Sequence, residues 1–211
     1  MFTTPERGAR SSGRTVVLTA AALVTAVLSV AAVIAGNRVW QGAPYPSVDP
    51  DAVAQRIKDR SDWVYEGFAL SGKYTASPGT VATGSCYYRG LRSVAHIDQP
   101  RDDVYSFGLG WSVPDVPEAT AEEAQRRVRG RLEQQGWKVS YEGDRSGATF
   151  RERGYRFLSP DGSDKVDVRW NTSTTTLFVS VYAPCGQVPD GFSGYNWPAA
   201  RWSPKERAAG S

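Results

Sequence analysis

The chain has 211 residues, a length that fits one domain or at most two. Its 25 basic and 22 acidic residues leave a formal net charge of +3, which is too balanced for a dedicated nucleic-acid binder. Two cysteines and one histidine exclude a zinc site of four thiolates and any site that needs two histidines. Common nucleotide-binding and hydrolase motifs are absent from the sequence, which therefore predicts no cofactor and assigns no catalytic residue.

Residues 15–36 form a run without charged side chains. As a helix they would extend roughly 33 Å, enough to cross a hydrocarbon core of about 30 Å. Three arginines precede the run and only Arg38 closely follows it, which favours a cytoplasmic N-terminus and an extracytoplasmic remainder. The alternative is a signal peptide cleaved near Ala35, which would make the protein secreted. The run is longer than the apolar part of a usual signal peptide, so a retained anchor is favoured.

Composition divides the chain into five segments. They are a basic cytoplasmic tail (1–14), a transmembrane helix (15–36), a linker rich in Gly and Pro (37–48), an extracytoplasmic domain (49–187), and a tail rich in Pro, Gly and aromatic residues (188–211). Most of the last segment is expected to be poorly ordered.

The domain is predicted to begin with a helix, because Asp49 is a good N-cap residue and Pro50 suits the first helical position. The apolar stripe of this helix is thin, so we expect it to be short; its members are Val53, Ile57 and Val64. Residues 73–85 have the composition of a loop or irregular strand. A regular strand is expected to begin at Cys86 and to continue to about residue 97.

Residues 105–113 alternate large apolar with small side chains, the period of a β-strand. The small face consists of Ser106, Gly108, Gly110 and Ser112. It suits close packing against the helix that follows or, alternatively, the close approach of a ligand to the backbone.

A helix is predicted over residues 120–135, with Thr120 and Glu123 as a capping box and Val128 and Leu132 buried. Four more strands follow, separated by short turns. Their inner faces are expected to hold Trp137, Val139 and Tyr141, then part of 149–158, then Val166, Val168 and Trp170, then Leu177, Val179 and Val181. This order predicts an α+β fold, a small antiparallel sheet with a helix packed on one face, preceded by one transmembrane helix.

The layout of a short basic N-terminus, one span and a compact domain containing RLEQQGWKV resembles single-pass membrane-anchored proteins of high-GC Gram-positive (actinobacterial) bacteria. Those proteins are uncharacterised, so the resemblance implies an envelope location and carries over no catalytic residue.

A metal site is one interpretation of the acidic segment around the single histidine. Its candidate ligands are His96, Asp98, Asp102 and Asp103, a donor set that suits a hard or borderline divalent ion. The alternative is a strand end followed by a solvated acidic turn, and we favour it.

Two groups of residues are candidates for a binding surface. Arg151, Arg153 and Arg156 form a basic cluster that either binds an anionic polymer or lipid headgroups, or guards an exposed strand. In the tail, Trp197, Arg201 and Trp202 either bind a ligand or fold back over the sheet.

Cys86 and Cys185 are the only cysteines, and both follow the predicted span. Oxidising conditions outside the cytoplasm make a disulfide between them the expected state.

Together these features predict a membrane-tethered extracytoplasmic domain that binds or scaffolds at the cell envelope. Its partners would be the membrane, through 15–36, and either a cell-wall polymer or a neighbouring membrane protein; nucleic acid is not expected. The alternative is a carboxylate-based hydrolase of wall polymer, using acids such as Asp98, Asp102, Asp103 and Glu142.

Overall fold

The computed structural model describes residues 29, 31–147, 151–194, 197 and 200–204. They form two compact units. The first contains the described part of Met1–Pro44 together with Tyr88–Gln99, and the second contains Tyr45–Tyr87 together with the described residues from Pro100 onward.

The second unit is built on a seven-stranded sheet with the order β3-β4-β5-β6-β2-β1-β7. Every neighbouring pair of these strands is antiparallel. The strands are β1 (Gly79–Tyr87), β2 (Pro100–Val113), β3 (Lys138–Ser146), β4 (Arg151–Leu158), β5 (Lys165–Asn171), β6 (Thr176–Gln187) and β7 (Arg201–Trp202).

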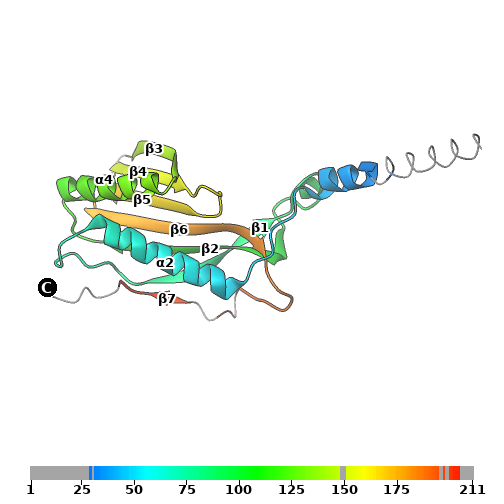
Figure 1. The fold of residues 1–211 in the computed structure, drawn as a ribbon, viewed down its shortest axis with the longest axis horizontal. Coiled ribbons are helices and arrows are strands. Elements are labelled where there is room, and N and C mark those ends of the chain that lie inside the picture. The colour runs from blue at the N-terminus through cyan, green and yellow to red at the C-terminus, as the bar shows by residue number, and fades with distance from the viewer. Residues whose placement is uncertain (1–28, 30, 148–150, 195–196, 198–199, 205–211) are drawn as a thin grey trace, which may run out of the picture. The chain divides into compact units, whose positions relative to one another are not determined.

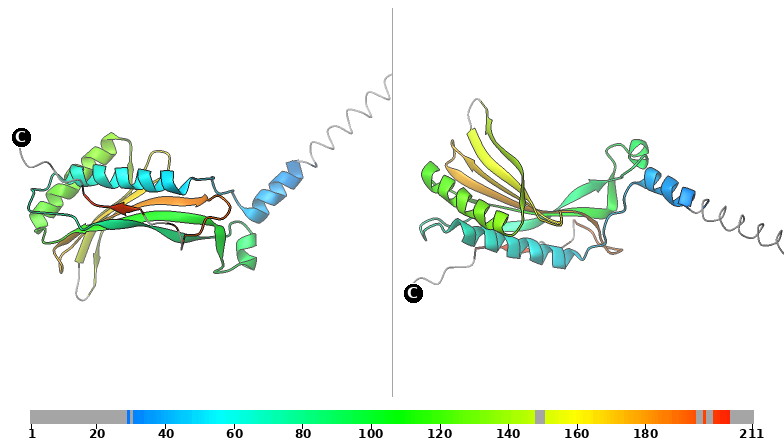
Figure 2. Two further views of the ribbon diagram at one scale, coloured as in Figure 1. Left: turned by 90° about the horizontal axis from the view of Figure 1, so that it is seen from below. Right: turned by 45° about the horizontal axis from the view of Figure 1, so that its top comes forward.

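Two long helices, α2 (Pro50–Phe68) and α4 (Glu118–Gln134), lie on the same face of this sheet (Figures 1 and 2). The core fills the space between them and the strands. Apolar side chains of β2, β5 and β6 point toward the helices, among them Leu109, Val113, Val168, Trp170, Val179 and Val181. The predicted α+β fold is confirmed, with two helices on the covered face where one was expected.

Helix α2 begins as predicted, because the Asp49 carboxylate accepts a hydrogen bond from the backbone N–H of Asp51 at 3.1 Å. At 19 residues it is longer than expected. Small residues explain the difference: Ala54, Ser61 and Gly67 are buried between the apolar positions and complete the packed face. The number of large apolar residues alone therefore gave too short a helix.

Helix α4 buries Val128 and Leu132 as predicted, but the predicted capping box is wrong. The helix starts at Glu118, with Pro117 in the N-cap position and no side chain capping it. Thr120 therefore lies inside the first turn, and the Pro117 carbonyl accepts the first helical hydrogen bond from Ala121 at 2.9 Å.

The strand predicted from Cys86 onward is also misplaced. The observed strand, β1, begins at Gly79 in the segment expected to be a loop or irregular strand, and it ends at Tyr87. Beyond Gly90, which has a φ of +63°, the chain turns into a four-residue helix, α3 (Arg92–Ala95). Small residues such as Gly79 and Gly84 make β1 look like a loop, although they face closely approaching neighbours in the sheet.

The disulfide between Cys86 and Cys185 is present, with 6.1 Å between the two Cα atoms. It joins β1 to β6, which both pair with β2. Each cysteine lies at a register shift, between Ser85 and Tyr87 in β1 and opposite the Tyr105–Phe107 step of β2. A bulge takes a residue out of the ladder and redirects its side chain, which lets the two sulfur atoms meet.

In the first unit, residues 31–41 are helical and all of them are exposed. Most of the predicted span, 15–36, lies outside the described residues. In the part of the chain that the structure describes, no helix combines the length and apolar character needed to cross a membrane.

Candidate functional site on the open face of the sheet

The two faces of the sheet differ in composition. Most side chains on the face covered by the helices are apolar. On the other face, β4, β5 and β6 carry charged and tyrosine side chains at alternate positions. In the described part of the second unit, no helix lies over this open face (Figure 2). A hollow of about 190 Å³ opens there, lined by Tyr141, Gly143, Glu152, Gly154, Tyr155, Arg156, Asp167, Arg169 and Tyr182.

An ion pair lies at the centre of the hollow. Arg156 donates two hydrogen bonds to the Asp167 carboxylate, from Nε at 2.7 Å and from Nη2 at 2.9 Å. This carboxylate raises the pKa of the Arg156 guanidinium above its ordinary value. The Asp167 side chain is only 11% exposed, whereas that of Arg156 is 45% exposed and faces the opening. The nearly buried Asp167 carboxylate thus holds the Arg156 guanidinium in place, while the guanidinium stays accessible to solvent.

A second, looser pair lies beside it. Arg169 Nη1 is 3.6 Å from Glu152 Oε2, and the Glu152 side chain is the more buried of the two. The two arginines and two carboxylates balance in charge, while each guanidinium keeps exposed N–H groups. The hollow therefore offers donors and acceptors without a net charge.

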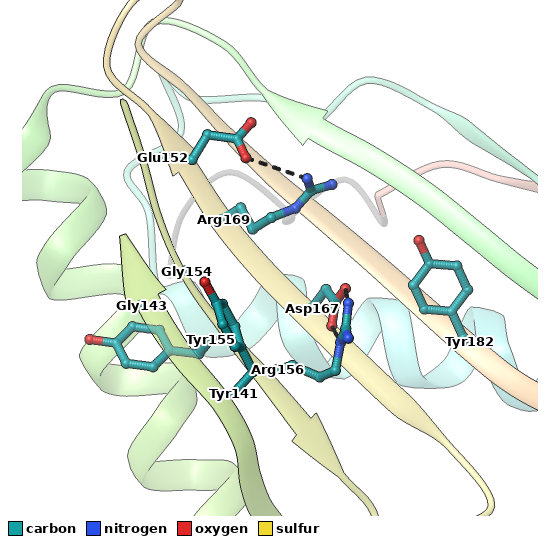
Figure 3. Close-up of a pocket in the computed structure, with 9 residues that line it drawn as sticks. All are labelled: Tyr141, Gly143, Glu152, Gly154, Tyr155, Arg156, Asp167, Arg169 and Tyr182. Atoms are coloured by element: carbon teal, nitrogen blue, oxygen red, sulfur yellow. Dashed lines mark hydrogen bonds and ion pairs between the residues drawn. The ribbon is translucent and has the colours of Figure 1, made fainter. Parts of the chain in front are cut away.

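Two tyrosines flank the central ion pair, as Figure 3 shows: Tyr141 from β3 lies on one side of Arg156 and Asp167, and Tyr182 from β6 lies on the other. Their side chains are 40% and 41% exposed. Few large aromatic residues of this unit are as exposed as these two.

A glycine lies under each tyrosine. A Cβ atom on Gly108 would lie 2.9 Å from Tyr182 Cδ1, and one on Gly143 would lie 2.8 Å from the Tyr141 hydroxyl. The two tyrosine rings therefore lie close to the sheet backbone. A larger residue in place of either glycine would push the ring away from the sheet. Gly108 on the small face of β2 thus supports Tyr182. Of the two interpretations of this face, packing against the predicted helix 120–135 is wrong, because α4 lies on the other face of the sheet (Figure 2).

Gly154 forms part of the floor. A Cβ atom there would lie 2.9 Å from the Val168 carbonyl oxygen and 2.7 Å from Arg169 Cγ. A glycine inside a strand often marks a bulge, but β4 pairs regularly at Gly154, with Gly143 on one side and Arg169 on the other. This glycine allows β4 and β5 to approach without filling the hollow.

The bulge lies instead in β3, between Val139 and Tyr141. Val139 packs against the core, as predicted, whereas Tyr141 is carried to the open face. Because a one-residue shift reverses the face of every later side chain, alternation alone placed Tyr141 with the core. Sequence reasoning also missed Glu152, Asp167, Arg169 and Tyr182, although strict alternation with the buried valines of β5 and β6 marks the last three.

The predicted basic cluster is divided between the two faces. Arg156 lines the hollow, while Arg151 and Arg153 both bind Asp144 on the helix side, at 3.0 and 3.2 Å. Arg153 also pairs with Glu122 of α4. The three arginines therefore do not form one basic patch.

The tail residues take the second of the two predicted alternatives. Trp202 is buried, and Trp197 packs on Phe107 with 5.7 Å between the ring centroids. Trp197 Nε1 donates to Asp51 at 3.0 Å. Of the three tail residues proposed as a binding surface, only Arg201 remains exposed.

Two of the four predicted metal ligands, His96 and Asp103, have other partners. His96 Nδ1 lies 2.9 Å from Gln99 Oε1, and its ring stacks on Tyr88. Asp103 is bound by Arg101 at 2.5 Å, and that hydrogen bond lowers the pKa of the Asp103 carboxyl. Across the described residues, no group of three or more potential ligands is arranged to hold a metal ion. Asp98 and His96 belong to the first unit, and Asp102 and Asp103 to the second.

The acids proposed for a hydrolase do not line the hollow. Glu142 lies on the helix side, where it accepts a hydrogen bond from Arg129 at 3.1 Å. Asp103 is occupied by Arg101, and the lowered pKa opposes a role as general acid. The two carboxylates that do line the hollow, Glu152 and Asp167, are each paired with an arginine.

No protein-family model, curated protein or solved structure matches this chain.

Proposed function

We propose that this protein is a membrane-tethered module of the bacterial cell envelope that binds a neutral, hydroxyl-rich polymer, such as a wall glycan, on the open face of its sheet. The observation that carries the proposal is the hollow in which the Arg156–Asp167 pair lies between the exposed rings of Tyr141 and Tyr182. The tether would be residues 15–36, with the N-terminus in the cytoplasm and the domain outside, as in the membrane-anchored actinobacterial proteins that the chain resembles.

The chemistry of a sugar chain fits this arrangement. A tyrosine ring offers an apolar face to the C–H groups of a sugar ring, and a phenol hydroxyl can both donate and accept hydrogen bonds. Hydroxyl groups both donate and accept, so they match the carboxylate oxygens and guanidinium N–H groups that the hollow offers side by side. Pockets of this kind gain specificity from a few convergent polar groups.

An anionic polymer fits less well. Two carboxylates, Glu152 and Asp167, line the hollow, and they would repel a phosphate backbone. Each arginine already has a carboxylate partner, so a phosphate would have to compete with Asp167 or Glu152 for the guanidinium. This charge balance favours a neutral glycan over a teichoic acid.

Binding of the full chain in detergent to purified wall glycan, stripped of teichoic polymers, tests the proposal. Tyr141→Ala and Tyr182→Ala should each weaken binding about tenfold or more, since central aromatic contacts dominate binding energy. Tyr87→Ala is the matched control, because Tyr87 is 50% exposed and does not line the hollow. Equal binding by all three variants and the unaltered protein would refute this site.

The same assay separates binding from hydrolysis. A binding module leaves the glycan intact, so no new reducing ends should appear during prolonged incubation. Release of fragments that is lost in Asp167→Asn or Glu142→Gln would instead establish the hydrolase alternative.

A further inference from the structure

The first unit carries an apolar surface made by two segments distant in sequence. Residues 31–41 form the exposed helix, and the segment 88–99 packs against its C-terminal end. The Leu91 N–H donates to the Val39 carbonyl at 3.1 Å, and Arg89 Nη1 donates to the Ala43 carbonyl at 3.3 Å. The loop is therefore fixed to the residues that directly follow the uncharged run.

Two glycines make this attachment close. Gly42 and Gly90 both have positive φ values, +73° and +63°. A Cβ atom on Gly90 would lie 2.7 Å from the carbonyl oxygens of both Val39 and Trp40. The backbones of the two segments thus cross in direct contact, a packing that no larger residue permits.

The segment 88–99 reverses the usual distribution of polar and apolar side chains. Its polar and aromatic residues face one another: His96 stacks on Tyr88 at 4.2 Å, and the Arg92 guanidinium lies 4.7 Å from the Tyr88 ring centroid. The aliphatic residues Leu91, Val94 and Ile97 point outward instead, with 53%, 68% and 69% of their surface exposed. A spacing of three residues places them on one side of the α3 region.

The helix adds to this surface. Val39 and Trp40 are 61% and 52% exposed, at the end of the helix that the loop contacts. The segments 37–44 and 88–99 contain three arginines (Arg38, Arg89 and Arg92), one histidine (His96) and one acidic residue (Asp98). Apolar side chains with tryptophan and an excess of arginine are the composition of proteins that lie in a membrane interface.

We infer that the 88–99 loop and the end of the 31–41 helix together dock onto the surface of an anionic lipid bilayer, with Leu91, Val94 and Ile97 inserted among the headgroups. This inference rests on the tether in the proposed function. It adds a second contact with the membrane, made by residues far from the span in sequence.

The dimensions agree with this position. If the span ends at Gly36, Val39 lies three residues beyond it, or about 4.5 Å along a helix. The headgroup layer is about 5–8 Å thick on each side of the hydrocarbon core. The hydrogen bond from Leu91 to Val39 therefore holds the loop at headgroup depth.

The test uses the full chain reconstituted into vesicles made of equal parts phosphatidylcholine and phosphatidylglycerol. Val94→Cys and Ile97→Cys variants each carry a nitroxide label, and Thr174→Cys in the exposed β5–β6 turn is the matched control. Because the native cysteines are joined to each other, the introduced thiol alone reacts. Mass measurement under non-reducing conditions checks that each variant retains the native disulfide.

Labels at 94 and 97 should be accessible to oxygen and at least fivefold less accessible to a water-soluble nickel chelate than the label at 174. Equal access of the chelate to all three labels, in protein that floats with the vesicles, would overturn the docking and leave the tether intact. Failure of the unlabelled chain to float with the vesicles would instead refute the tether.

Discussion

Trp202, near the end of the described chain, stacks on Trp111 of β2 with 5.0 Å between the ring centroids and an interplanar angle of 29°. The Trp202 indole N–H donates to the Asp62 carboxylate of α2 at 2.8 Å. One residue of the tail thus joins the sheet to the helix that covers it. Arg201 and Trp202 therefore complete the fold, because β7 pairs with the edge of β1 and the Trp202 ring covers that of Trp111.

Replacing this tryptophan should destabilise the domain strongly. Trp202→Ala removes a ring that is 2% exposed and leaves a cavity beside Trp111, which is expected to cost about 3–5 kcal/mol. Trp40→Ala is the matched control, because that ring is 52% exposed and its loss should change the free energy of unfolding by less than about 0.5 kcal/mol. Denaturant unfolding of the full chain in detergent measures both, and similar small effects would show that the tail is not part of the core.

The disulfide between Cys86 and Cys185 should contribute about 2–4 kcal/mol, because it closes a loop across a sequence separation of 99 residues and restricts the unfolded chain. The double variant Cys86→Ala/Cys185→Ala should therefore unfold at lower denaturant concentration, and a reducing agent should have the same effect on the unaltered protein. Peptide mass spectrometry of protein taken from the cell envelope should find the two cysteines linked. Two free thiols would contradict both the bridge and the proposed extracytoplasmic location.

The topology can be tested separately. A reporter that is active only outside the cytoplasm should work when it is fused after Ser211, because the arginines before residue 15 favour a cytoplasmic N-terminus. The same reporter fused at the N-terminus should be inactive. The reverse pattern would place the domain in the cytoplasm.

Long apolar alternation predicted the centre of the fold well. In β2, β5 and β6 the large residues expected to face inward are buried, except Tyr105 at the start of the β2 pattern, which is only partly buried. An antiparallel sheet covered on one face imposes that period. The pattern failed where backbone geometry departs from it. The bulge between Val139 and Tyr141 reversed the face of the chain, and nothing in the local composition marks such a shift.

Composition suggested too little structure at one edge of the sheet, where β1 and β7 are neighbours. β1 contains so many small residues that its segment resembled a loop or irregular strand, and the tail around Trp202 has the Gly and Pro content of a poorly ordered segment. Both are held by long-range contacts: β1 pairs with β2, and Trp202 packs on Trp111. Val81 pairs with Leu109, and Trp202 stacks on the still more distant Trp111, so a local window of sequence does not contain these contacts.

Helix α4 offers a test of how it packs against the sheet. Leu132 is fully buried, so Leu132→Ala should cost about 2–5 kcal/mol. Arg129→Ala should cost little, although the structure adds partners for Arg129 that the sequence did not reveal: Glu142 at 3.1 Å and the Tyr155 ring at 5.2 Å. Arg126, with 69% of its side chain exposed, is the cleaner control. If Leu132→Ala were as mild as Arg126→Ala, the assigned facing of the helix would be wrong.

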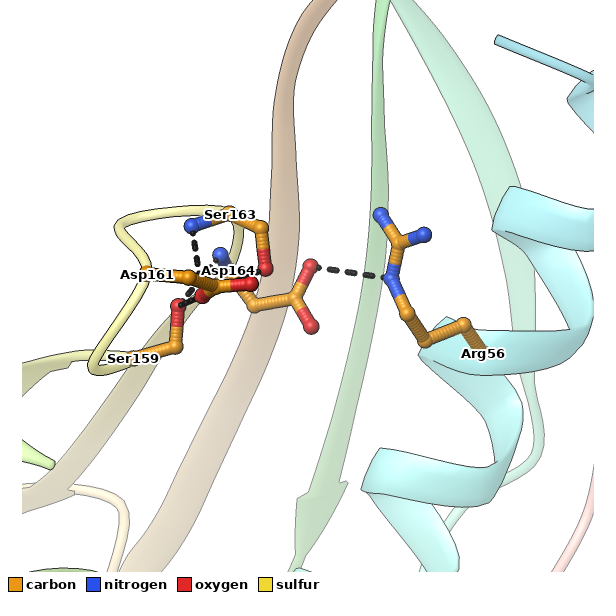
Figure 4. Close-up of polar contacts among 5 residues, drawn as sticks. All are labelled: Arg56, Ser159, Asp161, Ser163 and Asp164. Carbon is orange, nitrogen blue, oxygen red and sulfur yellow. Dashed lines mark hydrogen bonds and ion pairs between the residues drawn. The ribbon is translucent and has the colours of Figure 1, made fainter. Parts of the chain in front are cut away.

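The turn between β4 and β5 should make the domain sensitive to acid. Asp161 accepts hydrogen bonds from the Ser159 hydroxyl at 2.6 Å, the Ser163 hydroxyl at 2.8 Å and the Ser163 backbone N–H at 3.0 Å. These bonds, that from Ser159 above all, hold the pKa of the Asp161 carboxyl well below its ordinary value of 3.8. Asp164 in the same turn binds Arg56 of α2 at 3.2 Å, so the turn is linked to the helix layer (Figure 4).

A carboxyl whose pKa is lower in the folded protein stabilises it fully above the unfolded pKa. As the pH falls below about 4, the unfolded chain takes up the proton first, so this contribution is lost. NMR titration of the intact protein should find Asp161 still ionised at a pH where an ordinary aspartate is half protonated. Asp161→Asn should have lower stability at neutral pH and a shallower loss of stability in acid. Titration of Asp161 near 3.8 would show that the serine hydrogen bonds seen in Figure 4 do not hold the carboxylate in solution.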